Sequence, residues 1–578
     1  MCGLYFSSSN RQLDVKGLEE SMTERGGDDF QYRSIAADDR LLNLAHSRLE
    51  INSRGSVIQP CIGENIAILF NGEIYNYRNL TSDGADLSEI EVIYRLYQQG
   101  GIDSLKSLDG MFAIVIVDLE KQQVICLRDF VGQKPLWINQ SVDSFEIASD
   151  PSYFQVGEKE REHYVNYVSK VNLGIGLGLS SLTGIKEIGC NKVEVFDLTS
   201  GDQHSFNTLF DGLSDYKAKN KEIFEDGGFS TVITKAVKDV VPEQEFGLFL
   251  SGGLDSRAVL TALMKIGSPP KCCFTLKGSE TNVAARVASF YGIPLQVIDV
   301  DSAENVRVVK NYLGSQNLTS VDPAAIGLVV LSKACREHGL KVALCGDGGD
   351  EALLGYDFFF GKETKVTGRK AEVISWVFKC IGLLAGLSKE AKLVANTSVG
   401  RHLSRKERIP GLFRLSLSFL NRSQLLDLYE LVSSYKTLQD FYYGFVLPQS
   451  LCRKTDTAAH HAKIEVRSPF LQLDFLSAGR AYAKEGLITD NTKKVLRDFC
   501  KESFEVAPIG PKTGLNLELE KSIQVMKDTL SEVENLRDIS KELPGSSRFF
   551  RAILPLFFML NRKALYSSLK VRASNLTV

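Results

Sequence analysis

The sequence contains no apolar run long enough to cross a membrane. Its most apolar stretch, residues 373–387, is interrupted by Lys379 and is shorter than the roughly 20 residues of a membrane-spanning helix. The first residues also lack the basic and apolar regions of a signal peptide. We therefore expect a cytoplasmic protein without a membrane partner, in which residues 373–387 form a buried helix.

Paired cysteines and an excess of positive charge are also missing. The 11 cysteines form no CxxC pair, and an odd number disfavours a disulfide framework. The 68 basic and 71 acidic residues are interspersed and leave a net charge of −3, whereas nucleic-acid binding usually needs a one-sided basic surface. These absences predict a reducing compartment, no nucleic-acid partner and small-molecule substrates.

The chain is long enough for more than one hydrophobic core. Its 578 residues predict at least two domains of roughly 100 to 250 residues each. Residues 2–206 consist mostly of short apolar runs separated by turns, which predicts strands at residues 65–70, 111–119 and 124–127. Ser88 is placed as the N-cap of one helix among these strands.

The pattern changes after a polar stretch that ends near Gly228. Strands and helices then alternate, beginning with a strand at residues 246–250, which is the βαβ pattern of a parallel sheet. From about Gly361, helical periodicity continues to the end of the chain. Residues 207–520 are therefore predicted as a second domain, and residues 521–578 as a helical tail whose role the sequence does not reveal.

Cys2 becomes the N-terminal residue once Met1 is removed, and its own α-amino group can then act as the base for its thiol. An ordinary residue of an N-terminal strand is the alternative. Asn71 and Gly72 follow a predicted strand, and an Asn amide beside a Gly N–H is a suitable donor pair for a tetrahedral oxyanion. Asn-Gly is also common in hairpin turns. Together the two features indicate nucleophilic attack on an amide.

A glycine-rich loop separates the predicted strand at residues 246–250 from the following helix. In this context, backbone N–H groups and a helix N-terminus commonly bind phosphate groups. The loop consists of Ser251, Gly252, Gly253, Leu254, Asp255 and Ser256. It lacks the GxxxxGK[ST] pattern of a Walker loop. A loop of small residues without a ligand is the alternative to nucleotide binding.

Three carboxylates fall within five residues at the end of another predicted strand. They belong to Asp347, Asp350 and Glu351. Neighbouring carboxylates repel one another unless a cation lies among them, so a Mg²⁺ site is physically reasonable. A solvated acidic turn is the alternative.

Several short segments occur in the order typical of a class II glutamine amidotransferase fused to an ATP pyrophosphatase. In the first half they are Cys2-Gly3, residues 25–28, 45–49, 59–60, 71–76, 108–113 and 128–129. In the second half they are residues 251–256, 345–351, 454–456, 465–471 and the K-x-x-L-R element at 493–497. Over residues 2–515 the sequence thus resembles the glutamine-hydrolysing asparagine synthetases.

The resemblance implies a fold for each half. Residues 2–206 would form an α+β N-terminal-nucleophile glutaminase domain, an αββα sandwich. Residues 207–520 would form an α/β ATP-pyrophosphatase domain with a doubly wound parallel sheet and a helical C-terminal extension.

The resemblance also assigns roles in the glutaminase half. Cys2 would attack the side-chain amide of glutamine, while Asn71 and Gly72 hold the oxyanion. Arg48 would bind the α-carboxylate of glutamine through its planar guanidinium. Glu73 would bind the α-amino group. Glu89 stands where the family usually has an aspartate for the same amino group, so its carboxylate is one methylene longer.

In the synthetase half, the resemblance places residues 251–256 around the phosphates of ATP. Leu276 and Gly346 would also belong to the ATP site. Asp255 and Asp350 would bind Mg²⁺, while Asp347 and Glu351 line the acceptor side. Lys493 would neutralise charge that develops on the α-phosphate; a lone lysine elsewhere would be taken as a surface residue.

The implied reaction is the adenylation of a carboxylate by ATP, followed by displacement of AMP by ammonia from glutamine. Aspartate is the expected acceptor. Bulk water protonates ammonia, so we expect an apolar tunnel between the two sites. The oligomeric state stays open, a homodimer being one option.

Two alternatives remain. Thr457, Gln472 and the pair Ala324-Ala325 depart from the family pattern, which leaves open another acceptor such as a sugar acid or a biosynthetic intermediate. A non-catalytic binding or regulatory protein is the other alternative, and the presence of both Cys2 and Lys493 argues against it.

Overall fold

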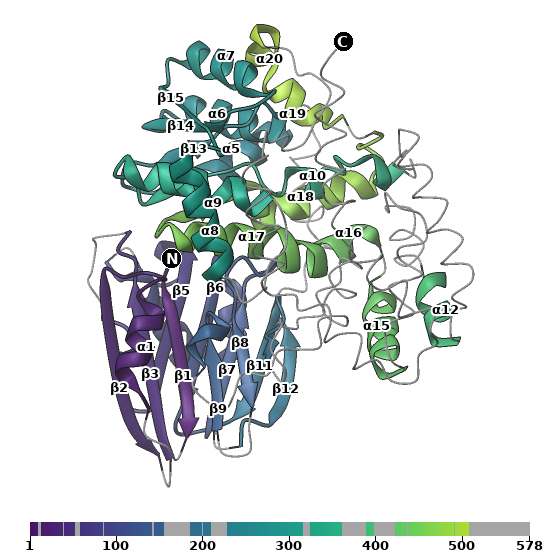
Figure 1. Ribbon diagram of the computed structural model, residues 1–578. Coiled ribbons are helices and arrows are strands. Elements are labelled where there is room, and N and C mark those ends of the chain that lie inside the picture. The colour runs from purple at the N-terminus through teal and green to yellow at the C-terminus, as the bar shows by residue number, and fades with distance from the viewer. Residues whose placement is uncertain are drawn as a thin grey trace, which may run out of the picture.

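A computed structural model describes the greater part of the chain (Figure 1). The described residues are 1–9, 13–37, 40–51, 58–84, 86–140, 144–154, 185–198, 200–209, 228–315, 324–360, 389–397, 422–435, 437–490 and 492–507. The predicted buried helix at residues 373–387 and the predicted tail at residues 521–578 lie outside these ranges. No helix among the described residues has both the length and the apolar character needed to cross a membrane.

The N-terminal half contains two six-stranded antiparallel sheets. In spatial order, the first consists of β10 (Ile185–Glu187), β8 (Trp137–Gln140), β9 (Ser144–Ala148), β1 (Gly3–Ser9), β3 (Arg40–Arg48) and β2 (Asp29–Ala37). The second consists of β12 (Gln203–Thr208), β11 (Lys192–Asp197), β7 (Gln123–Arg128), β6 (Gly110–Asp118), β5 (Ile66–Ile74) and β4 (Cys61–Ile62).

The two sheets pack face to face with a helix on each outer face. Alternate residues of a strand point to opposite faces, so Leu4 and Leu69 join one core between the sheets. Tyr5, on the other face of β1, packs with Leu18 of α1 (Val15–Met22). Residues on the outer face of β5 and β6 pack against α2 (Glu89–Ser104). The predicted αββα sandwich is confirmed.

Asn71, Gly72 and Glu73 lie inside β5 and pair with β6, so the prediction that they follow a strand is wrong. The strand runs on to Ile74 because β6 continues alongside it, with Gly72 opposite Phe112. A Cβ atom on Gly72, whose φ is +144°, would lie 1.9 Å from the carbonyl oxygen of Met111. The hairpin-turn alternative is therefore excluded.

The C-terminal half is built on a five-stranded parallel sheet. Its spatial order is β15 (Leu295–Ile298), β14 (Cys272–Leu276), β13 (Gly247–Phe249), β16 (Val342–Leu344) and β17 (Glu465–Arg467). The prediction of helix alone after residue 361 is wrong at β17. This strand of three residues is too short to show a periodicity of its own, and it forms because β16 offers it a parallel edge.

Helices cover both faces of this sheet, as a parallel sheet requires. Leu248 packs with helices α5, α6 and α18 on one face, and Phe249 packs with α9 and α17 on the other. The larger helices of this half are α5 (Gly228–Val240), α6 (Leu254–Lys265), α7 (Thr281–Tyr291), α8 (Ala303–Ser315), α9 (Ala324–Glu337), α15 (Arg422–Ser434), the π-helix η7 (Tyr442–Cys452), α17 (Arg453–His461) and α18 (Leu473–Lys484). Shorter helices are α10 (Gly349–Ala352), α12 (Lys389–Asn396), α16 (Leu438–Phe441), α19 (Lys494–Phe499) and α20 (Lys501–Val506).

The strand order reverses between β13 and β16. Strands β14 and β15 extend the sheet on one side of β13, while β16 and β17 extend it on the other. Ligands of doubly wound sheets bind at the carboxyl ends of the strands beside such a switch point. The glycine-rich loop follows β13 and the acidic segment follows β16, so the fold places both sequence signatures at this position.

Ser88 caps α2 as expected, and the cap gives a test of the sandwich. Its hydroxyl accepts from the backbone N–H of Glu91, and the Glu91 carboxylate accepts from the backbone N–H of Ser88. Replacing Ser88 by Ala should lower the free energy of unfolding of the N-terminal domain by about 1 kcal/mol, measured by chemical denaturation. Ser107→Ala removes an exposed hydroxyl bonded only to Ser104 and serves as the control. An equal loss in both variants would contradict the capping role.

Candidate active sites

Cys2 is held from two sides just before β1. Its backbone N–H donates to Asn71 Oδ1 over 3.1 Å. Its carbonyl oxygen accepts from Arg25 Nε over 2.8 Å. Cys2 is half-buried, so its thiol lies at the edge of the packed core. The sandwich therefore brings the predicted nucleophile to one of its predicted oxyanion donors.

Asn71 retains a buried hydrogen-bond donor with nothing to bind. Its side chain is fully buried, and its Nδ2 makes no hydrogen bond with any described residue. Unpaired buried donors are rare and costly in native proteins. A donor of this kind beside a nucleophile is suited to an oxygen atom that a ligand brings.

Arg48 and Glu89 lie close to the same end of the sandwich. Gly3 pairs with Ser47 in the antiparallel pairing of β1 with β3, so Arg48 stands one step further, next to Cys2. Its Nη2 lies 3.9 Å from a carboxylate oxygen of Glu50. Glu89, at the start of α2, accepts from the backbone N–H of Ile74 over 2.5 Å. Burial, followed by the charge of the neighbouring Glu73, raises the pKa of Glu89 well above its ordinary value.

Glu73 pairs with an arginine of the other domain. Arg467 Nη2, from β17, lies 2.8 Å from Glu73 Oε1, and both side chains are almost fully buried. Burial raises the pKa of Glu73 to about 7, and the charge of Arg467 opposes that rise. Arg467 also donates through Nε to Glu465 over 2.9 Å. The β5 strand of the sandwich is thus tied electrostatically to the parallel sheet.

Met1 lies between the two domains. It is 2% exposed and belongs to the same buried apolar cluster as Phe249, Cys345 and Val466 of the parallel-sheet domain. Burial lowers the pKa of the Met1 α-amino group to about 5, so an amine in this environment stays unprotonated at neutral pH.

Hydrogen bonds to the side chains of its two serines fix the conformation of the glycine-rich loop. The Ser251 backbone N–H donates to Ser256 Oγ, and the Gly253 N–H donates to Ser251 Oγ, each over 3.1 Å. Helix α6 begins directly after Gly253. The loop thus leads into the N-terminus of α6, where a helix dipole favours negative charge. Leu276, a residue predicted for the ATP site, ends the adjacent strand β14.

Lys493 joins the two sequence signatures. Its Nζ lies 2.6 Å from Asp255 Oδ2 and 2.7 Å from Asp350 Oδ1. Burial alone would lower the pKa of Lys493, but the two carboxylates outweigh that effect and raise it. The backbone of Lys493 is left-handed, with φ +52°, a conformation that is costly for residues other than glycine and persists only where the surrounding structure holds it. Three predicted residues thus meet at one point.

Asp255 and Asp350 form a donor set that fits Mg²⁺ bound together with phosphates. This ion usually takes one or two protein carboxylates and completes its shell with substrate oxygens and water. Glycines leave room for both carboxylates: a Cβ on Gly349 would lie 2.4 Å from Asp255 Oδ1, and a Cβ on Gly355 would lie 2.1 Å from Asp350 Oδ1. Within the described residues, no cluster of three or more His, Cys, Asp or Glu side chains forms a metal cage.

The remaining predicted residues surround this centre. Gly346 packs against the glycine-rich loop, where a Cβ would lie 2.6 Å from the backbone nitrogen of Ser256. Asp347 accepts from Thr455 Oγ1 over 2.9 Å. Glu351 is buried and accepts from the hydroxyl of Tyr356 over 2.7 Å. Burial, followed by the charge of Asp350, raises the pKa of Glu351 to about 7.

The positions that depart from the family pattern serve packing. Gln472 donates to the carbonyl oxygen of Ala236 in α5 over 3.0 Å. The Thr457 hydroxyl lies 3.1 Å from that of Tyr312 in α8. Ala325 is part of a buried apolar cluster. These three side chains therefore have partners within the packed domain, although the buried Oε1 of Gln472 makes no hydrogen bond with a described residue.

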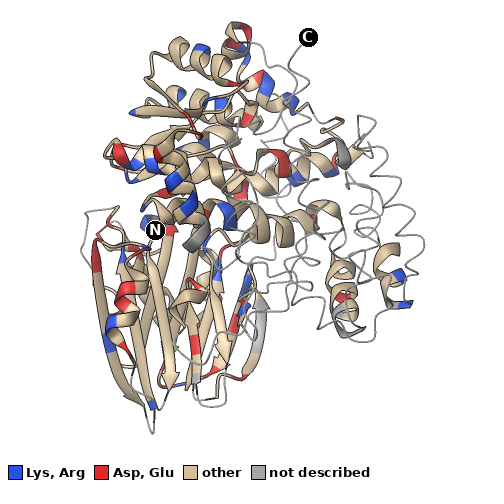
Figure 2. Cartoon of the chain, in the orientation of Figure 1, with Lys and Arg blue, Asp and Glu red and all other residues tan. Residues whose placement is uncertain are grey.

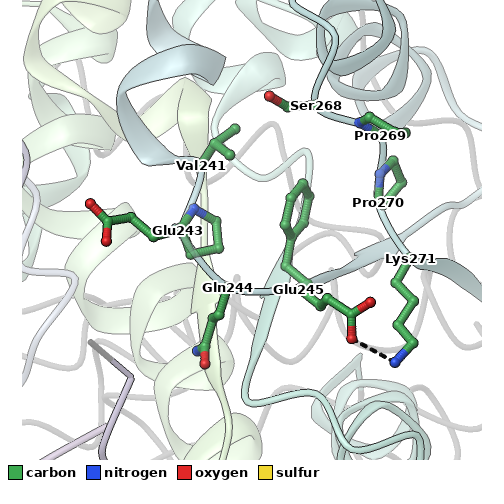
Figure 3. Close-up of a pocket in the computed structure, with 10 residues that line it drawn as sticks. Val241, Glu243, Gln244, Glu245, Ser268, Pro269, Pro270 and Lys271 are labelled. Carbon is green, nitrogen blue, oxygen red and sulfur yellow. Dashed lines mark hydrogen bonds and ion pairs between the residues drawn. The ribbon is translucent and has the colours of Figure 1, made fainter. Parts of the chain in front are cut away.

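A pocket of the parallel-sheet domain lies away from both signatures. It is lined by residues 241–246 and 268–271, and Lys271 pairs with Glu245 over 2.6 Å (Figure 3). These residues precede β13 and β14, at the amino ends of the strands. Ligands of such sheets bind at the opposite ends, so this pocket is separate from the nucleotide signatures.

Sequence reasoning assigned no role to three charged residues that the structure places at these centres. They are Arg25, Asp456 and Arg467. Each lies in a segment that matched the family, but nothing in the local sequence identifies its partner.

Comparisons with known proteins agree with this architecture. A family model described as a glutamine amidotransferase domain matches residues 1–168, and one described as asparagine synthase matches residues 228–504. The matches place an amidotransferase domain before an asparagine synthase domain, and the curated proteins to which the chain is similar are glutamine-hydrolysing asparagine synthetases.

Relatives of this chain include a probable glutamine-hydrolysing asparagine synthetase of Acanthamoeba polyphaga mimivirus, 27% identical over 62% of this chain and 68% of that protein. The asparagine synthetase of Gallus gallus is 26% identical over 62% of this chain and 67% of its own length. Asparagine synthetase 3 of Arabidopsis thaliana is 30% identical over 55% of this chain and 54% of its own length. The chain thus spans between about half and two thirds of these relatives.

Among solved structures, the chain is similar to the glutamine phosphoribosylpyrophosphate amidotransferase of B. subtilis. The identity is 13%, and the similarity covers 61% of this chain and 77% of that chain, with a TM-score of 0.26. At that score the similarity carries no argument about the fold.

The raised pKa of Glu351 predicts a pH-dependent stability. Between about pH 4.5 and pH 7, the folded protein keeps a proton on Glu351 that the unfolded chain releases. The contribution of Glu351 to the free energy of unfolding therefore falls as the pH rises through this window. Glu351→Gln should gain thermal stability relative to the parent between pH 5 and pH 8, measured without nucleotide. Glu20→Gln, which alters an exposed carboxylate, should show no such gain; a pH-independent difference for Glu351→Gln would contradict the assignment.

Proposed function

We propose that this protein makes an amide from glutamine, ATP and the carboxylate of L-aspartate, giving L-asparagine, glutamate, AMP and pyrophosphate. The observation that carries the proposal is the assembly of two centres from residues far apart in sequence. One centre contains Cys2 and Asn71, and the other contains Lys493, Asp255 and Asp350.

In the first half-reaction, the Cys2 thiol attacks the side-chain amide of glutamine. Removal of Met1 frees the α-amino group of Cys2, which takes the thiol proton. As the carbon–nitrogen bond of the tetrahedral intermediate breaks, this amine gives the proton to the leaving ammonia, and water then hydrolyses the thioester to glutamate. The buried Nδ2 of Asn71 and the Gly72 backbone hold the oxyanion, while Arg48, Glu73 and Glu89 bind the α-substituents of glutamine.

In the second half-reaction, the acceptor carboxylate attacks the α-phosphorus of ATP. The phosphates lie in the loop of residues 251–256, with Leu276 and Gly346 beside the nucleotide. Lys493 stabilises negative charge on the α-phosphate. Asp255 and Asp350 would hold Mg²⁺, which neutralises the pyrophosphate when bound. Asp347 and Glu351 face the acceptor.

The ammonia passes between the two centres through their shared interface. The apolar cluster that contains Met1, Cys345 and Val466 reaches from the residue before Cys2 to the strand end that carries Gly346. An apolar passage keeps ammonia unprotonated and nucleophilic. Loss of the Met1 side chain would leave space in this cluster beside the new N-terminus.

Aspartate is favoured over another acceptor because the curated relatives of this chain are asparagine synthetases and because the departing side chains also have partners within the packed domain. Gln472, Thr457 and Ala325 contact α5, α8 and an apolar cluster, respectively. The carboxylates expected on the acceptor side, Asp347 and Glu351, stand next to Lys493's partner Asp350. Two carboxylates there suit an acceptor that carries an ammonium group beside its reacting acid.

Cys2→Ala should separate the two half-reactions. Without the thiol, glutamine hydrolysis should fall by at least about 10³-fold, whereas amide synthesis from added ammonia should continue at the parental rate. Glutamate release and AMP formation measure the two activities. Cys61→Ala, which removes another half-buried thiol, is the matched control. Parental glutamine hydrolysis by Cys2→Ala would contradict the N-terminal assignment.

An acceptor screen tests the substrate. Purified protein with glutamine, ATP and Mg²⁺ should release pyrophosphate when aspartate is added, and asparagine should accumulate in equal amount. Glutamate, a sugar acid and no acid serve as comparison acceptors. If pyrophosphate is released with the sugar acid but not with aspartate, the sugar acid is the substrate and aspartate is not. The proposed amidotransferase chemistry would be unaffected.

A further inference from the structure

Asp456 of the parallel-sheet domain reaches the nucleophile of the other domain through a single arginine. Its two carboxylate oxygens accept from Arg25 Nη1 and Nη2 over 2.7 and 2.8 Å. The third nitrogen, Arg25 Nε, donates to the carbonyl oxygen of Cys2. The side chains of Arg25 and Asp456 are 1% and 2% exposed. The guanidinium is thus fixed by α17 on one side and holds Cys2 on the other.

This contact depends on charge as well as shape. Burial raises the pKa of Asp456, but the Arg25 charge outweighs burial and the pKa is lowered overall. The carboxylate therefore stays ionised. A guanidinium is planar, so an arginine that binds both oxygens of one carboxylate has little freedom to turn. Without the charge on Asp456, Arg25 loses the partner that sets its orientation, and the Cys2 backbone loses a fixed donor.

Arg467 also reaches the glutaminase half, where it forms an ion pair with Glu73. Glu73 follows the oxyanion residues Asn71 and Gly72 along β5, and Arg467 lies 2.8 Å from one of its carboxylate oxygens. The other titratable groups that face Glu73 are Glu465, Lys134, Cys2 and Glu89. Arg467 has the largest favourable effect on the ionised form of Glu73. Its backbone carbonyl accepts from the Cys345 N–H, so the parallel sheet holds it in place.

We propose that Asp456 and Arg467 are positioning residues of the glutamine-hydrolysing site, although both belong to the synthetase domain. Asp456 fixes Cys2 through Arg25, and Arg467 holds the Glu73 carboxylate in place through the 2.8 Å ion pair. The inference rests on the proposed function of Cys2 and Glu73. It means that the glutaminase site is complete only when the two domains are docked.

The full-length variants Asp456→Asn and Arg467→Met test the two roles. Misplacing a nucleophile by about 1 Å can cost on the order of 100-fold in rate, so Asp456→Asn should lower kcat for glutamine hydrolysis by roughly 10- to 100-fold. Arg467→Met should mainly raise KM for glutamine, by about 10-fold. Synthesis from added ammonia should stay within about two-fold of the parent. Unchanged glutamine hydrolysis in both variants would overturn the proposal.

Lys341→Met is the matched control for domain docking. Lys341 pairs with Asp28 of the other domain over 2.8 Å. Its amine donates to Asp28 and to the carbonyl oxygen of Glu50, rather than to Cys2 or Glu73. Its side chain is about a quarter exposed. A loss of glutamine hydrolysis in Lys341→Met equal to that in Asp456→Asn would assign the effect to docking in general and overturn the proposal.

Two further readouts separate positioning from a structural role. If Asp456→Asn loses both activities, Asp456→Glu is measured, and it should lose glutamine hydrolysis selectively; equal loss of both activities overturns the proposal.

In Arg467→Met, Glu73 keeps its proton to a higher pH. The KM of the Arg467→Met variant for glutamine should therefore fall more steeply than that of the parent from pH 7 to pH 9. If KM depends on pH in the same way in the variant and the parent, Arg467 has no positioning role in the glutamine-hydrolysing site.

The parent and Cys2→Ala proteins are assayed alongside. If the parent hydrolyses glutamine and Cys2→Ala does not, the proposed function stands, and the result for Asp456→Asn and Arg467→Met bears on the inference alone. If the parent does not hydrolyse glutamine, the proposed function itself fails.

Discussion

Charged side chains buried between the two domains fix their relative arrangement. Arg25 with Asp456, Lys134 with Glu465, and Arg467 with Glu73 all pair across this boundary, and each side chain is close to fully enclosed. Burying an ion costs several kcal/mol, and removing one partner of a buried pair costs roughly 3–5 kcal/mol. Sliding one domain over the other would break several such pairs at once. Elsewhere, acidic and basic residues are mixed over both domains (Figure 2).

The parallel sheet brings the predicted nucleotide-binding segments together because the two neighbouring strands that precede them end at the same edge. The glycine-rich loop after β13 and the acidic segment after β16 meet through glycines that let backbone and carboxylates approach closely. Lys493 comes from much later in the chain, and its left-handed backbone turns its amine to both segments. A strained lysine held by two carboxylates is stable only because the surrounding strands and helices are already packed.

Local patterns predicted a strand-rich first half and a parallel sheet in the second, since strand alternation and βαβ spacing are properties of neighbouring residues; the αββα sandwich followed from the family resemblance. The sequence did not reveal β17, whose three residues become a strand only beside β16. It also placed Asn71 after a strand, because the pairing that extends β5 comes from β6. The candidate site residues followed from family motifs. The partners Asp456 and Arg467 could not be predicted, because pairing over hundreds of residues is decided by tertiary packing.

The position of Lys493 has a consequence for how the synthetase site loads. A side chain tethered next to its partners has an effective concentration of roughly millimolar or more. A free divalent cation would have to displace this built-in counter-ion from Asp255 and Asp350. In the proposed reaction, a nucleotide polyanion would give Lys493 a substitute partner and release both carboxylates, so that metal and nucleotide would be taken up together.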